Sequence, residues 1–263
     1  MDKERSKDNI EQQIDTFTSI LEEESRFPMQ NPEGIKRKIQ NALRERQPVN
    51  FCCFVCLPLD LEIENEKPKY FVGNWKTRLE RSKNIKRFQE IINRLKSNNL
   101  SFSLKFTIAD TDIYDVWGNW LKNPDQTQAI NDFKTRITSL LSISEGVSVS
   151  KWSDLQTPYK SAYDQNFNMV FTKTLKFVDQ EYLTRGIEKR QDFFEQKKIN
   201  INPETLQICE QSSKRNVALY AAQGPIIENL FDFLIIADPD PLRMGKIQSL
   251  LAPELGIWYP IPE

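Results

Sequence analysis

The chain has 263 residues, with 36 Lys and Arg against 37 Asp and Glu, so its formal net charge is −1. With 39% apolar and 28% charged residues, its composition is that of a globular protein that can fill a sizeable core. The sequence contains no histidine, which excludes Ser-His-Asp and Cys-His nucleophile systems, Cys/His zinc fingers and HExxH metallopeptidases. Acid–base chemistry must therefore come from Asp, Glu, Tyr, Cys, Lys, the substrate or water.

The first part of the chain is predicted to be helical. Apolar residues at spacings of three and four predict an amphipathic helix over 8–21, and a short basic helix follows over 35–43. The start, MDKERSKDNIEQQ, is charged and lacks the apolar core of a signal peptide. No apolar run approaches the roughly 18 residues of a transmembrane helix. We therefore expect a cytoplasmic protein with no membrane contact.

Two strands joined by a helix follow. The apolar run VNFCCFVCL at 49–57 lies between two prolines and predicts a strand that is buried on both faces. After a polar loop over 58–69, Ser82 can cap a helix over 82–96, and alternation predicts a second strand over 101–109. The connection is too long for a hairpin, so we expect a parallel βαβ unit.

The rest of the chain repeats this pattern, which predicts a single doubly wound, mostly parallel Rossmann-like α/β domain over 48–263 behind a helical N-terminal lead over 1–47. The further elements expected are a helix from Pro124 to Leu141, a strand over 147–151, a helical stretch over 161–198, a helix from Pro203 to about Gln223 that ends at Gly224-Pro225, a strand over 230–237, a helix over 242–251 and an extended piece over 257–259.

Three of the four cysteines, Cys52, Cys53 and Cys56, crowd into the first predicted strand. The Cys53-x-x-Cys56 spacing can indicate a redox or metal site, but no second CxxC and no histidine exist to complete it. The alternative is that these are buried strand cysteines, since a free cysteine behaves as a small hydrophobe.

In open parallel sheets, ligands bind at the carboxyl ends of the strands, where the strand order reverses. Cys56 ends the first strand, Asp110 and Asp112 follow the second, and Asp238 and Asp240 follow the strand over 230–237. Together these carboxylates suit a primary ammonium or a divalent cation. Each aspartate alone can equally cap the turn that follows its strand.

Both aspartate pairs have the Asp-x-Asp pattern with which nucleotide-sugar glycosyltransferases hold a metal ion between two phosphates. The chain has no GxGxxG or GxxxxGK[ST] loop and only 8 glycines, so a nucleotide cofactor is not expected. We predict no cofactor and assign no metal ligands.

The helix over 82–96 has a basic stripe that includes Lys83, Lys86, Arg87 and Arg94. Such a stripe can bind a phosphodiester backbone, or it can be the solvated face of an amphipathic helix.

The element order, the stretch LKFTIADTDIYD at 104–115 after a basic helix, Tyr220 in a late helix and Tyr259-Pro260 near the end of the sequence resemble the tRNA-dependent cyclodipeptide synthases. That family has a Rossmann domain similar to class I tyrosyl- and tryptophanyl-tRNA synthetases. It converts two aminoacyl-tRNAs into a cyclic dipeptide through an aminoacyl-enzyme. The resemblance implies a transferase of secondary metabolism that binds aminoacyl-tRNA rather than DNA.

On this resemblance, Cys56 replaces the family's nucleophilic serine, and Tyr220 and Tyr259 position the attacking amine or move its proton. Asp110, Asp112 and Asp238 bind the amino-acid substrate, while Lys83, Lys86, Arg87 and Arg94 bind tRNA. The family's tyrosine is followed four residues later by glutamate, whereas Gly224 stands four residues after Tyr220. Three alternatives stay open: an enzyme similar to the isocyanide synthases, which act on an amino acid, a metal-dependent glycosyltransferase, and an inactive binding protein. Either tyrosine can also be an ordinary buried residue.

Overall fold

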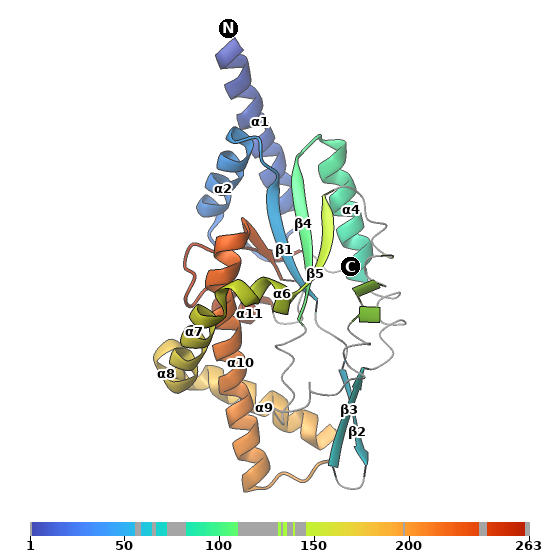
Figure 1. Cartoon of the computed structure of the whole chain (residues 1–263), viewed down its shortest axis with the longest axis vertical. Coiled ribbons are helices and arrows are strands. Elements are labelled where there is room, and N and C mark those ends of the chain that lie inside the picture. The colour runs from blue at the N-terminus through green and yellow to red at the C-terminus, as the bar shows by residue number, and fades with distance from the viewer. Residues whose placement is uncertain are drawn as a thin grey trace.

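The described chain contains both helices and strands in this computed structural model (Figure 1). The structure describes residues 2–55, 59–64, 67–72, 83–109, 146–196, 198–236 and 241–260, with helical pieces at 131–132, 134–135 and 139. Among these, the side chains of 2–8, 55–72, 83–88, Phe193 and Pro241 are not described. Most of the helix predicted from Pro124 to Leu141 lies outside the described residues.

The centre of the fold is a five-stranded sheet of order β5-β4-β1-β6-β7, in which every strand pair is parallel. β1 pairs with β4 along its whole length, with Val49 opposite Phe102 and Val55 opposite Ile108. This parallel pair confirms the predicted βαβ unit. The strands are β1 (Val49–Val55), β4 (Phe102–Ile108), β5 (Val147–Lys151), β6 (Phe233–Ile235) and β7 (Gly256–Trp258).

One face of the sheet packs against three helices (Figure 1), α1 (Asp2–Glu23), α2 (Pro32–Arg44) and α4 (Lys83–Ser97). Successive residues of a strand point to opposite faces, and Val49, Phe51 and Cys53 of β1 point to this one. Phe51 lies at the centre of the cluster, with its ring centroid 5.8 Å from that of Phe17 in α1 and 5.1 Å from that of Phe233 in β6. All three phenylalanines are buried.

The opposite face is covered mainly by α6 (Trp152–Gln156), α7 (Lys160–Thr172) and α10 (Pro203–Leu230). Cys52, Leu234 and Ile257 point to this face and are fully buried. Two more helices, α9 (Gln180–Gln196) and α11 (Pro241–Gln248), pack against α10, while α8 (Thr174–Phe177) follows α7. Because helices cover both faces, the sheet is doubly wound, as predicted.

The N-terminal helices are tied to the sheet through its edge strand, β7. The buried Trp258 donates a hydrogen bond from Nε1 to the Leu21 carbonyl and to Ser25 Oγ, both at 2.9 Å. The segment between α1 and α2 then runs along β7, and the Gln30 amide donates to the Ile257 carbonyl at 3.0 Å. The helices of 1–47 therefore share the core of the sheet, while the domain boundary at residue 47 stays a prediction.

The prediction that Gly224-Pro225 ends a helix is wrong, because α10 continues to Leu230 with Pro225 inside it. A proline usually disfavours helical geometry in the preceding residue through its contact with that residue's Cβ. Gly224 has no Cβ, so the helix passes this point. The following strand is correspondingly short and begins at Phe233 rather than at residue 230.

The polar loop predicted over 58–69 is also wrong. Within this segment, β2 (Leu59–Glu64) and β3 (Lys67–Val72) pair as a two-stranded antiparallel sheet. Its register sets Glu62 opposite Lys69 and Glu64 opposite Lys67. Opposite charges on facing strand positions favour such a pairing.

Candidate functional site

The strand order reverses at β1. From β1 the chain proceeds to β4 and β5 on one side, then returns to β6 and β7 on the other. The carboxyl ends lie level, since Val55 pairs with Ile108, Ile108 with Lys151, and Cys53 with Ile235. A crevice at this edge, between β1 and β6, is where sheets of this type bind ligands.

The residues that the sequence places just beyond these strand ends, Cys56, Asp110, Asp112 and Asp238, lie outside the described residues. Their roles stay predictions. The described strand ends at this edge are apolar except for Lys151, the last residue of β5. Within the described part of the chain, no three His, Cys, Asp or Glu side chains form a group that could hold a metal ion.

The two described cysteines of β1 are buried and point to opposite faces. Cys52 Sγ lies 3.5 Å from Thr107 Oγ1, and burial raises the pKa of the Cys52 thiol to about 12. A thiol with so high a pKa carries almost no thiolate near neutral pH, so it is a poor nucleophile. The interpretation as buried strand cysteines therefore fits Cys52 and Cys53.

A row of aromatic rings, which the sequence analysis did not single out, starts at the carboxyl end of β1. Phe54 packs against Trp152 at 5.3 Å, Trp152 against Tyr163 at 6.4 Å, and Tyr163 against Phe167 at 6.4 Å between ring centroids. Phe167 in turn stacks on Phe171 at 5.8 Å. The spacing of four between Tyr163, Phe167 and Phe171 in a helix is the signal that could have revealed it.

Two buried polar atoms belong to Trp152 of this row and to Ser150, two residues before it in the chain. Trp152 is fully buried, and neither its Nε1 nor Ser150 Oγ has a hydrogen-bond partner among the described residues. Buried donors are nearly always paired, so each is a point at which a ligand oxygen could complete the hydrogen bonding. We refer to the rings of Phe54, Trp152 and Tyr163, together with Ser150, as the aromatic wall.

Tyr259 is held firmly at the end of β7. Its hydroxyl donates to Gln30 Oε1 at 3.1 Å, and its ring packs edge-to-face on Phe27 at 6.3 Å. Burial raises the pKa of the Tyr259 phenol to about 12, so it stays protonated near neutral pH. A Cβ on residue 245 would lie 2.0 Å from the Tyr259 hydroxyl, so Gly245 makes room for this group.

Tyr220 packs against a different hydrophobic cluster from Tyr259. It is half-buried in α10 beside the cluster that includes Val217, Ala221 and Ile247, whereas Tyr259 packs with the residues under β6 and β7. Its phenol is also close enough to Arg190 of α9 to favour the charged form of that guanidinium. The structure therefore places the two tyrosines in different clusters.

Gly224 stands four residues after Tyr220, where the resemblance to cyclodipeptide synthases implies a glutamate. A Cβ there would lie 1.9 Å from the Gln248 carbonyl oxygen of α11 and 3.1 Å from Ala252 Cβ. No side chain fits at residue 224 unless α10 and α11 move apart. The neighbouring Gln223 is buried and accepts a hydrogen bond from Gln248 Nε2 at 3.3 Å.

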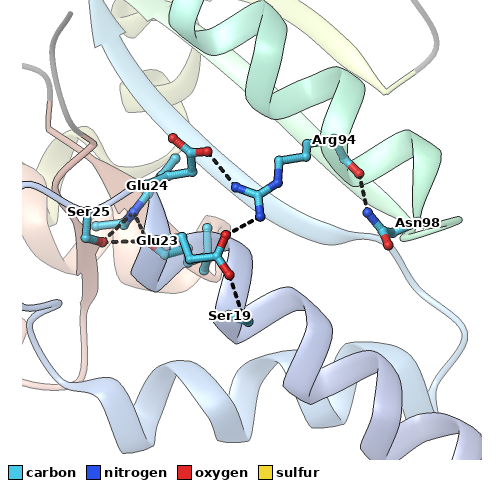
Figure 2. Close-up of polar contacts among 8 residues, drawn as sticks. Ser19, Glu23, Glu24, Ser25, Arg94 and Asn98 are labelled. Atoms are coloured by element: carbon cyan, nitrogen blue, oxygen red, sulfur yellow. Dashed lines mark hydrogen bonds and ion pairs between the residues drawn. The ribbon is translucent and has the colours of Figure 1, made fainter.

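Arg94, predicted to bind tRNA, makes ion pairs that join α4 to α1 (Figure 2). Its guanidinium donates to Glu24 Oε1 at 2.6 Å and also to the Glu23 carboxylate. Hydrogen bonds from Arg94 and Ser19 lower the pKa of Glu23. The side chains of Lys83, Lys86 and Arg87 lie outside those described, so binding of tRNA by α4 stays a prediction.

Comparison with solved structures finds proteins of similar fold. The PvcA protein of Pseudomonas aeruginosa matches with a TM-score of 0.50 and 10% identity, covering 92% of either chain. AlbC, a cyclodipeptide synthase from Streptomyces noursei, matches at 0.43 and 12%, covering 82% of this chain and 96% of AlbC. The tyrosyl-tRNA synthetase of Aeropyrum pernix matches at 0.47 and 8%, covering 94% of this chain and 61% of the synthetase.

No protein-family model and no curated protein matches the sequence. No helix in the described part of the chain is long and apolar enough to cross a membrane. Cyclodipeptide synthases, the family that the sequence resembles, are thus among the solved structures to which this chain is similar. At 10% identity, the likeness to the PvcA protein is one of fold alone.

Proposed function

We propose that this protein is a transferase that acts on amino-acid-derived substrates and uses aminoacyl-tRNA as a cyclodipeptide synthase does. The observation that carries the proposal is the carboxyl edge of the sheet, where the strand order reverses beside the aromatic wall. An apolar crevice at this edge would suit an amino-acid side chain and would exclude water from a reactive acyl group. The resemblance in element order and in the Tyr259-Pro260 pair supports the same conclusion.

In the proposed reaction, the Cys56 thiolate attacks the ester carbonyl of an aminoacyl-tRNA. A thioester forms, the ester C–O bond breaks, and the ribose oxygen that leaves takes up a proton. The amine of a second aminoacyl-tRNA then attacks the thioester and releases the thiol. Finally, the free amine of the dipeptidyl-tRNA attacks its own ester, which closes the cyclic dipeptide and releases tRNA. No external oxidant or reductant is needed.

The other predicted residues have binding roles in this proposal. Asp110, Asp112 and Asp238 would hold the α-ammonium by charge-assisted hydrogen bonds. Tyr259 stays protonated and its hydroxyl already donates to Gln30 Oε1, so it would position the attacking amine by accepting a hydrogen bond and would not act as a base. The basic residues of α4 would contact the tRNA backbone. Aminoacyl-tRNA occurs in the cytoplasm, which is where the proposal places the protein.

The test is expression in a bacterial host, followed by mass spectrometry of the culture for cyclic dipeptides. We expect cyclic dipeptides with the wild-type protein and none with Cys56→Ala. The matched control is Cys53→Ala, three residues earlier in the chain, which should give the wild-type yield. If folded wild-type protein yields no more cyclic dipeptide than the empty vector, the proposal is wrong.

One observation favours a second candidate, an inactive protein that binds aminoacyl-tRNA. The carboxylate that the family carries four residues after its tyrosine cannot be accommodated at Gly224 without separating α10 from α11. This candidate predicts binding of aminoacyl-tRNA in filter-binding assays without any cyclic dipeptide. The two measurements together separate a catalyst, a binding protein and a protein with neither property.

A further inference from the structure

Two arginines from different helices meet at Gly186 of α9. Arg190 of α9 donates from Nη1 to the Gly186 carbonyl at 2.7 Å. Arg243 of α11 approaches the same glycine so closely that a Cβ on residue 186 would lie 2.7 Å from its Nη2 atom. That Cβ would also lie 2.3 Å from Ser213 Oγ of α10, so a side chain at residue 186 would require the Arg243 and Ser213 side chains to shift.

Both guanidinium groups are fixed in place by neutral partners. Arg190 donates from Nε to Ser212 Oγ at 2.9 Å and from Nη2 to the Ser212 carbonyl at 3.3 Å. Arg243 lies over the Tyr182 ring at 4.5 Å from its centroid and donates to the Tyr182 carbonyl at 3.3 Å. The Tyr182 hydroxyl donates back to the Arg243 carbonyl at 3.1 Å.

Neither arginine makes an ion pair with a carboxylate in the part of the chain that the structure describes. Burial and the neighbouring charge of Arg243 lower the pKa of Arg190 to about 10. The other groups that influence the pKa of Arg190 are the Cys209 thiol and the Tyr220 phenol, and both favour the charged guanidinium. Two half-buried positive charges side by side are unfavourable without an anion.

A guanidinium has five N–H donors, and the hydrogen bonds to described residues use three of them on Arg190 and one on Arg243. Planar forks of this kind bind phosphate through two parallel hydrogen bonds. Because the neutral partners already hold both side chains, little rotamer freedom remains to be lost when an anion binds. The charge, the donors and the rigidity all suit an oxyanion.

We propose that Arg190 and Arg243 form a phosphate-binding site between α9, α10 and α11. The phosphate is either that of a small phosphorylated molecule or a phosphodiester of an RNA strand. The site does not depend on the proposed transferase activity, because it binds its ligand without any turnover.

The test is calorimetric titration of the full chain with inorganic phosphate, with sodium chloride at the same ionic strength as the reference. We expect saturable binding by the wild-type protein and a loss of about tenfold or more in affinity with Arg243→Gln. The matched control is Arg185→Gln on α9, where the guanidinium is exposed and already paired with Glu181, and it should bind phosphate as the wild type does. Thermal unfolding of each variant verifies that it is folded.

Competition then separates the two sources of phosphate. If deacylated tRNA displaces inorganic phosphate from the wild type, the ligand is an RNA phosphodiester; if phosphate binds and tRNA does not displace it, the ligand is a small phosphorylated molecule. Phosphate binding that is absent, or that is equal in the wild type and Arg243→Gln, would overturn the proposal. Failure to make cyclic dipeptides would leave it unaffected.

Discussion

The contact between Gly224 and α11 makes a sharp prediction for Gly224→Ala. The new Cβ would lie 1.9 Å from the Gln248 carbonyl oxygen, whereas ordinary contact begins at 3.4 Å. The two backbones must therefore separate by about 1.5 Å, which is the difference between those distances. The oxygen belongs to the backbone, so no side-chain rotation can relieve the contact.

The energetic terms of this substitution oppose each other, and the steric one should dominate. Forcing an extra methyl into a packed interior costs about 1–3 kcal/mol. Alanine gains up to about 1 kcal/mol over glycine in an ordinary helix, but Pro225 reduces that gain because it crowds a Cβ on the preceding residue. We expect a net destabilisation of about 2 kcal/mol, or a fall in melting temperature of roughly 4–8 °C.

The measurement is thermal and urea unfolding of Gly224→Ala beside Gln211→Ala, a control at an exposed position of the same helix. The control should unfold within about 0.5 kcal/mol of the wild type. If Gly224→Ala instead melts above the wild type, as helix propensity alone predicts, the close packing of α10 on α11 is wrong.

Three further predictions concern other contacts. Tyr259→Phe should lose about 1 kcal/mol of stability near pH 8. Because folding raises the pKa of the Tyr259 phenol to about 12, the stability difference between wild type and variant should shrink as the pH rises from about 10 to 12. A constant difference in the free energy of urea unfolding across that range would contradict this prediction. Arg94→Ala should lower stability by about 1–3 kcal/mol because it removes the ion pair with Glu24, whose side chain is only 8% exposed. Glu24→Gln is the matched variant, and equal stability of Arg94→Ala and wild type would refute the contribution of this ion pair. Iodoacetamide should modify Cys56 faster than Cys52, whose thiol pKa is about 12; peptide mapping that shows equal rates would remove Cys56 from the mechanism.

Much of the fold could be predicted because the chain's local signals agree with its tertiary structure. The apolar run at 49–57 has no alternation, and a strand of that kind is buried on both faces of a parallel sheet. The antiparallel pair of β2 and β3 differs from the predicted loop. Leu59, Leu61 and Ile63 alternate with acidic residues as in a strand, but the many acidic residues of the segment favour a loop. The continuation of α10 through Pro225 depends on Gly224, whereas a Gly-Pro pair in a sequence usually indicates the end of a helix.

The candidate site could be located from the sequence only as an edge of the sheet. The rule that ligands bind at the carboxyl ends of strands depends only on where the strand order reverses. In the structure the order reverses at β1. Pairs that form between distant elements have no local signal. Arg94 and Glu24 are 70 residues apart, and Arg190 and Arg243 meet only because α9 and α11 both pack around α10.

The central claim is that Cys56 accepts an aminoacyl group from tRNA, and it can be tested directly with purified protein. The protein is incubated with radiolabelled aminoacyl-tRNA, quenched in acid and digested for peptide mapping by mass spectrometry. We predict label on the peptide that contains Cys56, released by neutral hydroxylamine as a thioester should be, and absent from Cys56→Ala but present in Cys53→Ala. Wild-type protein that stays unlabelled, or label that persists in Cys56→Ala, would contradict the proposed mechanism.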